Sequence, residues 1–255
     1  HIARVLDAGE TESGDPYFVM ELVRGIPLTD FCDQNQLDPR ERLGLFIDVC
    51  QAVQHAHQKG IIHRDLKPGN VLVTLHDGKP VVKVIDFGVA KAVGQQLTER
   101  TIYTRFGQMI GTPLYMSPEQ ASAARHRTDH RTDLYSLGAT LYELATGRPV
   151  FSADTPHQVI NQILNTEPTP PGRLRPDLPR DLETILLKCL AKEPEQRYAN
   201  ARALADDLRA VLDGRPIRAR RAGIVERGVK WARRHRHSLT LAGGSVAATV
   251  AVVLL

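Results

Sequence analysis

The sequence predicts an α+β fold, with a mainly helical body and one small β-hairpin. Two runs rich in strand-forming residues, Val71 to Leu75 and Val81 to Ile85, flank a loop that contains Asp77-Gly78. This arrangement is typical of an antiparallel hairpin. Elsewhere apolar residues recur at helical spacing over several segments, and no internal repeat is found. Most of the chain is therefore predicted to be helical.

The longest predicted helix begins at Asp38. Asp38 can cap the helix, Pro39 suits the first helical position, and Glu41 can reach back to the amide of the cap. Gly60 is predicted to end the helix. The apolar residues in between that recur at helical spacing are Leu43, Phe46, Ile47, Cys50 and Val53.

Three further helices are predicted from amphipathic patterns. The first runs from Asp133 to Ala145 and is followed by Gly147. The other two carry apolar stripes. These stripes are Leu182, Ile185, Leu186, Cys189 and Leu190 in one helix, and Leu204, Leu208, Val211 and Leu212, followed by Gly214, in the other.

The cysteines and histidines argue against disulfide-stabilised and zinc-binding proteins. Cys32, Cys50 and Cys189 lie far apart, which fits neither a disulfide framework nor zinc spacing. His55 and His57 would face different sides of the predicted helix, so we interpret them as ordinary histidines rather than metal ligands.

Basic residues are concentrated near the C-terminus. Residues 215–237 contain nine Lys or Arg and one acid, so they carry +8 while the remainder carries −4. Residues 238–255 contain no charged residue, and at about 1.5 Å each they approach the ~30 Å thickness of a bilayer core. We predict a basic juxtamembrane linker over 215–237, with Trp231 at the interface, and a truncated transmembrane helix over 238–255. A solvated linker and a buried core helix are the alternatives, and nucleic-acid binding is not expected because no recognisable module is present.

Asn70 and Asp86 flank the predicted hairpin. Each lies eight residues from Gly78, so we expect the two side chains to meet at the open end of the hairpin. An amide oxygen and a carboxylate there would make a hard oxygen site suited to Mg²⁺. The hairpin alone leaves a turn-capping Asn and a surface Asp as the alternative.

Three motifs carry a family resemblance. The run His63-Arg64-Asp65-Leu66-Lys67-Pro68-Gly69-Asn70 and the later Asp86-Phe87-Gly88 resemble the catalytic loop and the metal-binding motif of protein kinases. Ser117-Pro118-Glu119 follows in the same order as in that family. The chain is similar to the eukaryotic-type (Hanks-type) serine/threonine protein kinases of bacteria over roughly residues 1–214. The resemblance implies a protein-kinase-like α+β fold, with the end of the small N-lobe and the hinge in 1–24 and the mainly helical C-lobe in 25–214.

The resemblance also implies a reaction, the transfer of the ATP γ-phosphate to serine or threonine hydroxyls of protein substrates. Asp65 would accept the proton of the substrate hydroxyl. Lys67, typical of serine/threonine kinases, would place a positive charge beside the transferred group. Asn70 and Asp86 would hold Mg²⁺ on the ATP phosphates.

The adenine site is implied in the same way. Tyr17 to Val23 resembles the last N-lobe strand and the hinge. Met20 would lie at the back of the adenine pocket, and Glu21 and Val23 would offer backbone groups to the base. Leu72 would form part of the pocket floor, and an ordinary buried strand is the alternative for this segment.

Regulatory and structural roles complete the resemblance. Arg64 would pair with a phosphate on the activation loop, where the candidate acceptors are Thr98, Thr101, Tyr103 and Thr104. Thr112 and Glu119 would belong to the segment that receives the substrate. Glu119 would also pair with Arg197, and Asp133 would support the backbone of the catalytic loop.

The printed sequence contains no Gly-rich loop, strand lysine or helix glutamate upstream of these motifs. Because kinases need the lysine–glutamate pair, we expect the chain to begin after the start of the domain and to be nearly inactive alone. The parent protein is expected to be a single-pass membrane protein with its kinase domain in the cytoplasm. A catalytically silent scaffold is the alternative, and the spacing of Gly243 and Ala247 leaves a homodimer open.

Overall fold

The computed structural model describes residues 1–13, 16–87, 113–122 and 128–219. The chain divides into two units, His1–Ala219 and Arg220–Leu255, and the second unit lies outside the described residues. The predicted transmembrane helix over 238–255 therefore lies outside them too. In the ranges that are described, no helix is long and apolar enough to cross a membrane. The domain boundaries at 24/25, 214/215 and 237/238 stay predictions.

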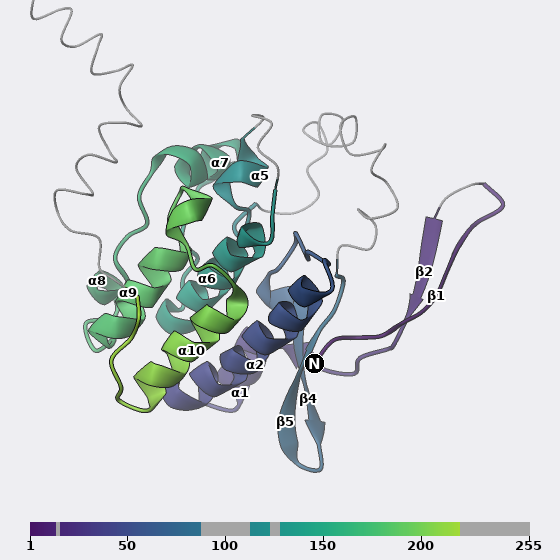
Figure 1. The fold of residues 1–255 in the computed structure, drawn as a ribbon, viewed down its shortest axis with the longest axis horizontal. Coiled ribbons are helices and arrows are strands. Elements are labelled where there is room, and N and C mark those ends of the chain that lie inside the picture. The colour runs from purple at the N-terminus through teal and green to yellow at the C-terminus, as the bar shows by residue number, and fades with distance from the viewer. Residues whose placement is uncertain (14–15, 88–112, 123–127, 220–255) are drawn as a thin grey trace, which may run out of the picture. The chain divides into compact units, whose positions relative to one another are not determined.

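The strands form two small antiparallel sheets (Figure 1). One sheet pairs β1 (Val5–Glu10) with β2 (Pro16–Met20). The other has the order β3 (Ile26–Pro27), β4 (Val71–His76) and β5 (Lys79–Val84). The predicted hairpin is thus confirmed as β4 and β5. Its turn residues Asp77 and Gly78 have φ of 50° and 73°, as a two-residue turn with both residues left-handed requires.

The register of this hairpin corrects one expectation. Val71 pairs with Val84 and His76 pairs with Lys79, so the turn is centred between Asp77 and Gly78 rather than at Gly78. Asn70 therefore lies opposite Ile85, whose amide donates to the Asn70 carbonyl at 3.0 Å. Asp86 comes one residue later. Asn70 and Asp86 both leave the open end of the hairpin, but they are offset by one residue.

The helices are α1 (Leu28–Gln34), α2 (Pro39–Gln58), α5 (Pro118–Ala121), α6 (Arg131–Thr146), α7 (Pro156–Asn165), α8 (Pro171–Leu174), α9 (Arg180–Cys189) and α10 (Ala201–Leu212), with 3₁₀ turns η1 (Pro68–Asn70) and η2 (Pro194–Gln196). The four helices predicted from the sequence are confirmed as α2, α6, α9 and α10. Sequence analysis missed α7 and the shorter helices.

The capping residues explain where α2 begins and ends. Asp38 Oδ1 accepts from the Glu41 amide and Glu41 Oε2 accepts from the Asp38 amide, both at 2.8 Å, so the predicted capping box is formed. Beyond the last turn, Gly60 has a φ of 74°, which suits a glycine after a helix end.

Helix α6 lies at the centre of the helical part, between α2 and α9 (Figure 1). Its residues from Thr132 to Tyr142 are all buried. Gly138 permits close contact with α9, because a Cβ at this position would lie 2.4 Å from the Cβ of Cys189. The same helix places Asp133 beside the segment that links α2 to β4. Packing of the core therefore positions the candidate site.

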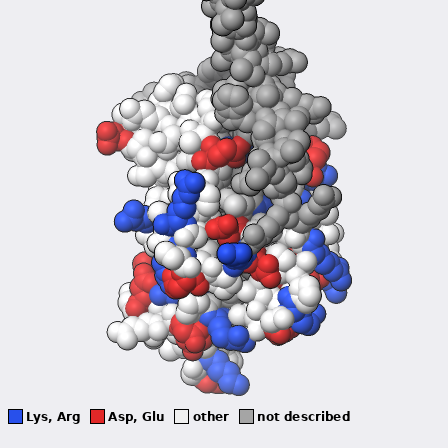
Figure 2. All heavy atoms as spheres, turned by 90° about the vertical axis from the view of Figure 1, so that its left-hand side faces the viewer, with Lys and Arg blue, Asp and Glu red and all other residues white. Residues whose placement is uncertain are grey.

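Charged side chains on the surface are of mixed sign. Figure 2 shows acidic and basic side chains interspersed over one face of the described residues. The positive excess of the chain is found in the sequence of residues 215–237. The first residues of that stretch fold back along α10, since the amides of Arg218 and Ala219 donate to the buried carboxylate of Asp207 at 2.8 and 2.9 Å.

Candidate active site

The loop over residues 63–70 is anchored by a buried carboxylate from α6. Asp133 is fully buried and accepts from the His63 amide through Oδ2 and from the Arg64 amide through Oδ1, both at 2.8 Å. His57 Nε2 lies 2.7 Å from Asp133 Oδ2 and is the donor, because an ionised carboxylate only accepts. The structure thus places Asp133 against the loop backbone, as the resemblance implied. Sequence analysis interpreted His57 as an ordinary histidine, because its partner Asp133 lies 76 residues away and no local pattern signals the contact.

His63 ties the same loop to the end of β5. Its Nδ1 accepts from the Asp65 amide at 3.3 Å, and its Nε2 donates to the Ile85 carbonyl at 2.9 Å. Burial lowers the pKa of His63, in keeping with a neutral ring that has one accepting and one donating nitrogen. The loop that precedes Asp65 is therefore held from both α6 and β5.

The reactive side chains of the loop remain open to solvent. The side chains of Asp65 and Lys67 are 58% and 43% exposed, and Lys67 Nζ lies 3.0 Å from Asp65 Oδ2. Asn70 Nδ2 donates to the Asp65 carbonyl at 2.9 Å and to its Oδ2 at 3.3 Å. The structure therefore brings together the three residues that the sequence nominated for catalysis.

Two residues of the site adopt a left-handed backbone. Arg64 has a φ of 66° and Asp86 a φ of 56°. For residues other than glycine such conformations cost on the order of 1–3 kcal/mol and persist only where the surrounding structure imposes them. Arg64 directly precedes the nominated catalytic Asp65, and Asp86 is itself a nominated magnesium ligand.

Asn70 and Asp86 offer donors that fit a magnesium ion. Because Asn70 Nδ2 donates to Asp65, Asn70 Oδ1 is the atom that would hold a cation. Asp86 is an exposed residue and follows β5 at the same open end of the hairpin. Among the described residues, no group of three His, Cys, Asp or Glu could hold a metal on its own. A site with few protein ligands suits Mg²⁺, because this ion usually retains several bound waters and takes further ligands from substrate phosphate oxygens.

The residues nominated for adenine lie at the end of β2 and on β4. Met20 is the last residue of β2 and is 36% exposed. The Glu21 amide donates to the Arg4 carbonyl at 2.8 Å, and the Glu21 carboxylate lies 2.9 Å from Lys83 Nζ. Val23 and Leu72 are half-buried. Their roles toward a nucleotide stay predictions.

The predicted regulatory hydroxyls, Thr98, Thr101, Tyr103 and Thr104, and also Thr112, lie outside the described residues. Arg64, which would pair with a phosphate there, has a buried Nε that makes no hydrogen bond with the residues that are described.

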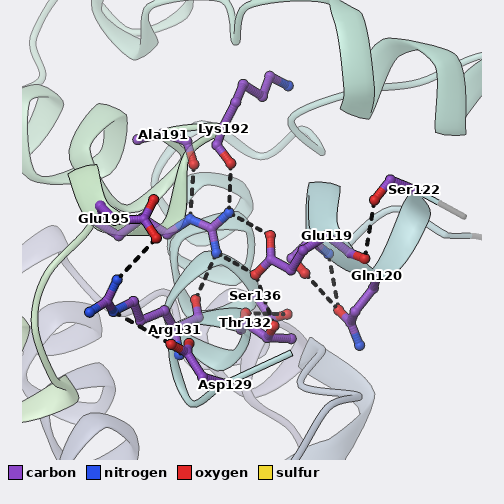
Figure 3. A network of polar contacts seen from close by, with 12 residues as sticks. Glu119, Gln120, Ser122, Asp129, Arg131, Thr132, Ser136, Ala191, Lys192 and Glu195 are labelled. Atoms are coloured by element: carbon purple, nitrogen blue, oxygen red, sulfur yellow. Dashed lines mark hydrogen bonds and ion pairs between the residues drawn. The ribbon is translucent and has the colours of Figure 1, made fainter. Parts of the chain in front are cut away.

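A buried ion pair holds the segment 113–122 to the helical body (Figure 3). Arg197 donates to both carboxylate oxygens of Glu119 at 2.7 Å, and Thr132 Oγ1 donates to Glu119 Oε1 at 2.8 Å. The other three guanidinium N–H groups donate to backbone carbonyls. These carbonyls belong to Ala191, Arg131 and Lys192.

The electrostatics of this pair follow from its bonds. Burial raises the pKa of Glu119, but the hydrogen bonds and charge of Arg197 outweigh burial and bring that pKa below its ordinary value of 4.5. The Arg197 guanidinium also lies over the Tyr135 ring, 5.1 Å from its centre. Nearby, burial lowers the pKa of Lys192 to about 7.

Comparisons with known proteins place this geometry in context. The sequence profile described as "Protein kinase domain" matches residues 1–208. The chain is 40% identical over 222 residues to the serine/threonine-protein kinase PknB of Mycobacterium leprae, covering 86% of this chain and 34% of that protein. It is 41% identical over 217 residues to PknB of Mycolicibacterium smegmatis, covering 84% of this chain and 33% of that protein. It is 40% identical to the probable serine/threonine-protein kinase SCO3848 of Streptomyces coelicolor over 86% of this chain and 32% of that protein.

A solved structure gives the same picture. The kinase domain of Mycobacterium tuberculosis PknI, crystallised as a double mutant, matches with a TM-score of 0.61 and 27% identity, covering 83% of this chain and 71% of that one. The chain spans about a third of the length of the curated relatives it matches.

Proposed function

This chain belongs to the protein kinase family, and we propose that it carries the catalytic residues of an ATP-dependent serine/threonine protein kinase. The predicted protein-kinase-like α+β fold is confirmed by the match to a solved kinase domain. The observation that carries the proposal is that Lys67 Nζ and Asn70 Nδ2 both donate to Oδ2 of the exposed Asp65 side chain. The backbone of this loop is fixed by Asp133. The names of the relatives support a serine or threonine acceptor.

We propose a task for each group. The exposed carboxylate of Asp65 would accept the proton of a serine or threonine hydroxyl, and Lys67 and Asn70 fix its orientation. The Lys67 ammonium would also stabilise negative charge on the transferred phosphoryl group. Magnesium held by Asn70 and Asp86 would supply further positive charge to the ATP phosphates.

Replacing Asp65 tests this function. The assay measures transfer of labelled γ-phosphate to a generic protein acceptor by the full-length product of the gene, followed by phosphoamino-acid analysis. We expect label on serine or threonine, and we expect Asp65→Asn to lower kcat by about 10²- to 10⁴-fold, the range typical of a lost general base. Unfolding by urea should be unchanged, because the Asp65 side chain is exposed.

A matched control is Asp77→Asn, which changes an exposed carboxylate in the hairpin turn, where Asn also adopts a left-handed backbone. This variant should retain full activity. Turnover retained by Asp65→Asn would contradict the role of Asp65. A wild-type protein that folds but transfers no phosphate would instead favour the scaffold alternative.

A location at the cell membrane, with the kinase on the cytoplasmic side, is a second part of the proposal. It is supported by the +8 charge of residues 215–237 directly before the uncharged run 238–255. Membrane fractions washed with alkaline carbonate should retain the full-length protein and release a variant that lacks 238–255. Recovery of the full-length protein in the soluble fraction would overturn this part alone. Pairing of two chains through this run stays a prediction.

A further inference from the structure

Gln120 links two parts of the candidate site through the two ends of one amide. It lies in α5, within the segment 113–122 and next to Glu119 (Figure 3). Its Oε1 accepts from the amide and the hydroxyl of Ser117, both at 3.1 Å. Its Nε2 donates to the carbonyl of Arg64 at 2.7 Å. The first contact is local to the turn, whereas the second reaches a residue 56 positions away.

The Arg64 carbonyl belongs to a strained residue directly before Asp65, so a bond to this carbonyl acts on the backbone next to that carboxylate. Arg64 has a left-handed backbone and directly precedes Asp65. Its amide is held by Asp133 Oδ1 from α6, and its carbonyl is held by Gln120 Nε2 from α5. This carbonyl shares a peptide plane with the Asp65 amide. Both backbone polar groups of a strained residue are thus fixed, from two different elements, immediately before the nominated catalytic carboxylate.

We propose that Gln120 is a positioning residue that couples the segment 113–122 to Asp65. In this proposal, which rests on the proposed kinase function, Asp65 keeps its working orientation only while that segment is docked and Gln120 holds the Arg64 carbonyl. A strained backbone persists only where its surroundings impose it, so losing one of the two anchors should release the peptide before Asp65. The competing account is that Gln120 only caps α5.

Replacing Gln120 with glutamate separates these two accounts. Glutamate keeps an oxygen that can accept from Ser117, and it is a common third residue in a capping box. It has no N–H to donate to the Arg64 carbonyl. Gln120→Met is a neutral variant that loses both contacts, so an effect shared by the two variants cannot come from the added charge.

The chain offers a matched control in α7. Gln158 makes the same kind of capping contact: its Oε1 accepts from the Thr155 backbone amide at 3.2 Å, and the Gln158 backbone amide donates to Thr155 Oγ1 at 3.3 Å. No contact from Gln158 to the loop over 63–70 is found among the described residues. Gln158→Glu therefore imposes the same chemical change on a cap that lies outside the site.

The kinetic comparison uses the full-length protein and a saturating protein acceptor. We expect Gln120→Glu and Gln120→Met to lower kcat by about 10- to 100-fold, the effect of a displacement near 1 Å at a reacting group. The KM for ATP should stay within about twofold, because nothing at the nucleotide site has changed. Gln158→Glu should match the wild-type protein. A kcat for Gln120→Glu within about twofold of Gln158→Glu would overturn the proposal and leave capping as the role of Gln120.

Hydrogen exchange gives a readout that needs no activity. The Arg64 and Asp65 amides both lie in the loop, and their exchange can be followed by mass spectrometry in a peptide spanning 61–67. Gln120→Glu should speed this exchange relative to wild type and Gln158→Glu, and equal rates would overturn the coupling. A wild-type protein without transferase activity would refute the proposed function, while this exchange comparison would still decide the role of Gln120.

Discussion

The loop over residues 63–70 and the Glu119–Arg197 network each contain a carboxylate paired with a cation, in opposite surroundings. In the loop, Asp65 and Lys67 form a single contact with side chains about half exposed. In the network, Glu119 and Arg197 have side chains that are 6% and 0% exposed and join through two bonds. An exposed pair contributes only about 0–1 kcal/mol to stability, because water competes for both charges. The loop therefore leaves its charges available for chemistry, while the network uses its charges to hold the fold.

The difference between the two pairs shows how many hydrogen bonds a buried charge requires. All five N–H groups of Arg197 have acceptors, and Glu119 receives a third bond from Thr132. These hydrogen bonds offset the free-energy cost of removing both ions from water, which is otherwise several kcal/mol for each ion. Asp65 needs no such support, since water solvates it. Substitutions should therefore affect activity in the first region and stability in the second.

Breaking the buried pair should have the largest effect on stability. Arg197→Met leaves the Glu119 carboxylate buried without its cation, so we expect the free energy of unfolding to fall by about 3–5 kcal/mol. The measurement is urea unfolding followed by circular dichroism. Arg175→Met is the control, because Arg175 pairs with Asp177 at the surface and its loss should cost about 0–1 kcal/mol. Equal losses for the two variants would contradict the contrast between buried and exposed pairs.

A smaller loss of stability is expected from Thr132, and a second buried threonine of α6, Thr140, is its control. Thr132→Val removes the hydroxyl that donates to Glu119 and should cost about 1.5–3 kcal/mol, as expected for a hydrogen bond to a charged group. Thr140 is also buried, but its hydroxyl has no hydrogen-bond partner among the described residues. Thr140→Val should therefore be neutral or stabilising in the same urea experiment. A loss for Thr140→Val as large as that for Thr132→Val would show that the bond to Glu119 is not the cause.

The smallest effect is expected in the pH dependence of stability. Since the pKa of folded Glu119 lies below its ordinary value of 4.5, the unfolded state binds the proton first as pH falls. The stabilisation by Glu119 is fully present above pH 4.5 and is lost as pH falls through the folded pKa. Glu119→Gln should remove this part of the acid dependence. Identical slopes of the free energy of unfolding against pH, for wild type and variant below pH 4.5, would exclude Glu119 as a source of acid sensitivity.

Local patterns predicted much of the fold. The boundaries of α2 followed from Asp38, Glu41 and Gly60, because caps act within one turn of a helix. Helix α7 was missed although it begins with a Thr155 capping arrangement and buries Val159, Ile160 and Ile163. It buries three apolar residues, fewer than the four buried apolar residues of α9, a helix of the same length that was predicted. The hairpin was placed correctly, but its register was displaced because the turn is centred between two residues rather than on Gly78.

By itself, the sequence determined the hairpin turn, the helix caps and the order of the motifs that identify the family, because each depends on neighbours within a few residues. Only the tertiary structure decided which distant groups meet. Asp133 lies 76 residues from His57, and Gln120 lies 56 residues from Arg64. These contacts depend on how α6 and α5 pack beside the loop over residues 63–70, and a one-dimensional pattern contains no distance between elements. The residues that bond the backbone next to Asp65 therefore became visible only in the folded structure, where packing brings their helices together.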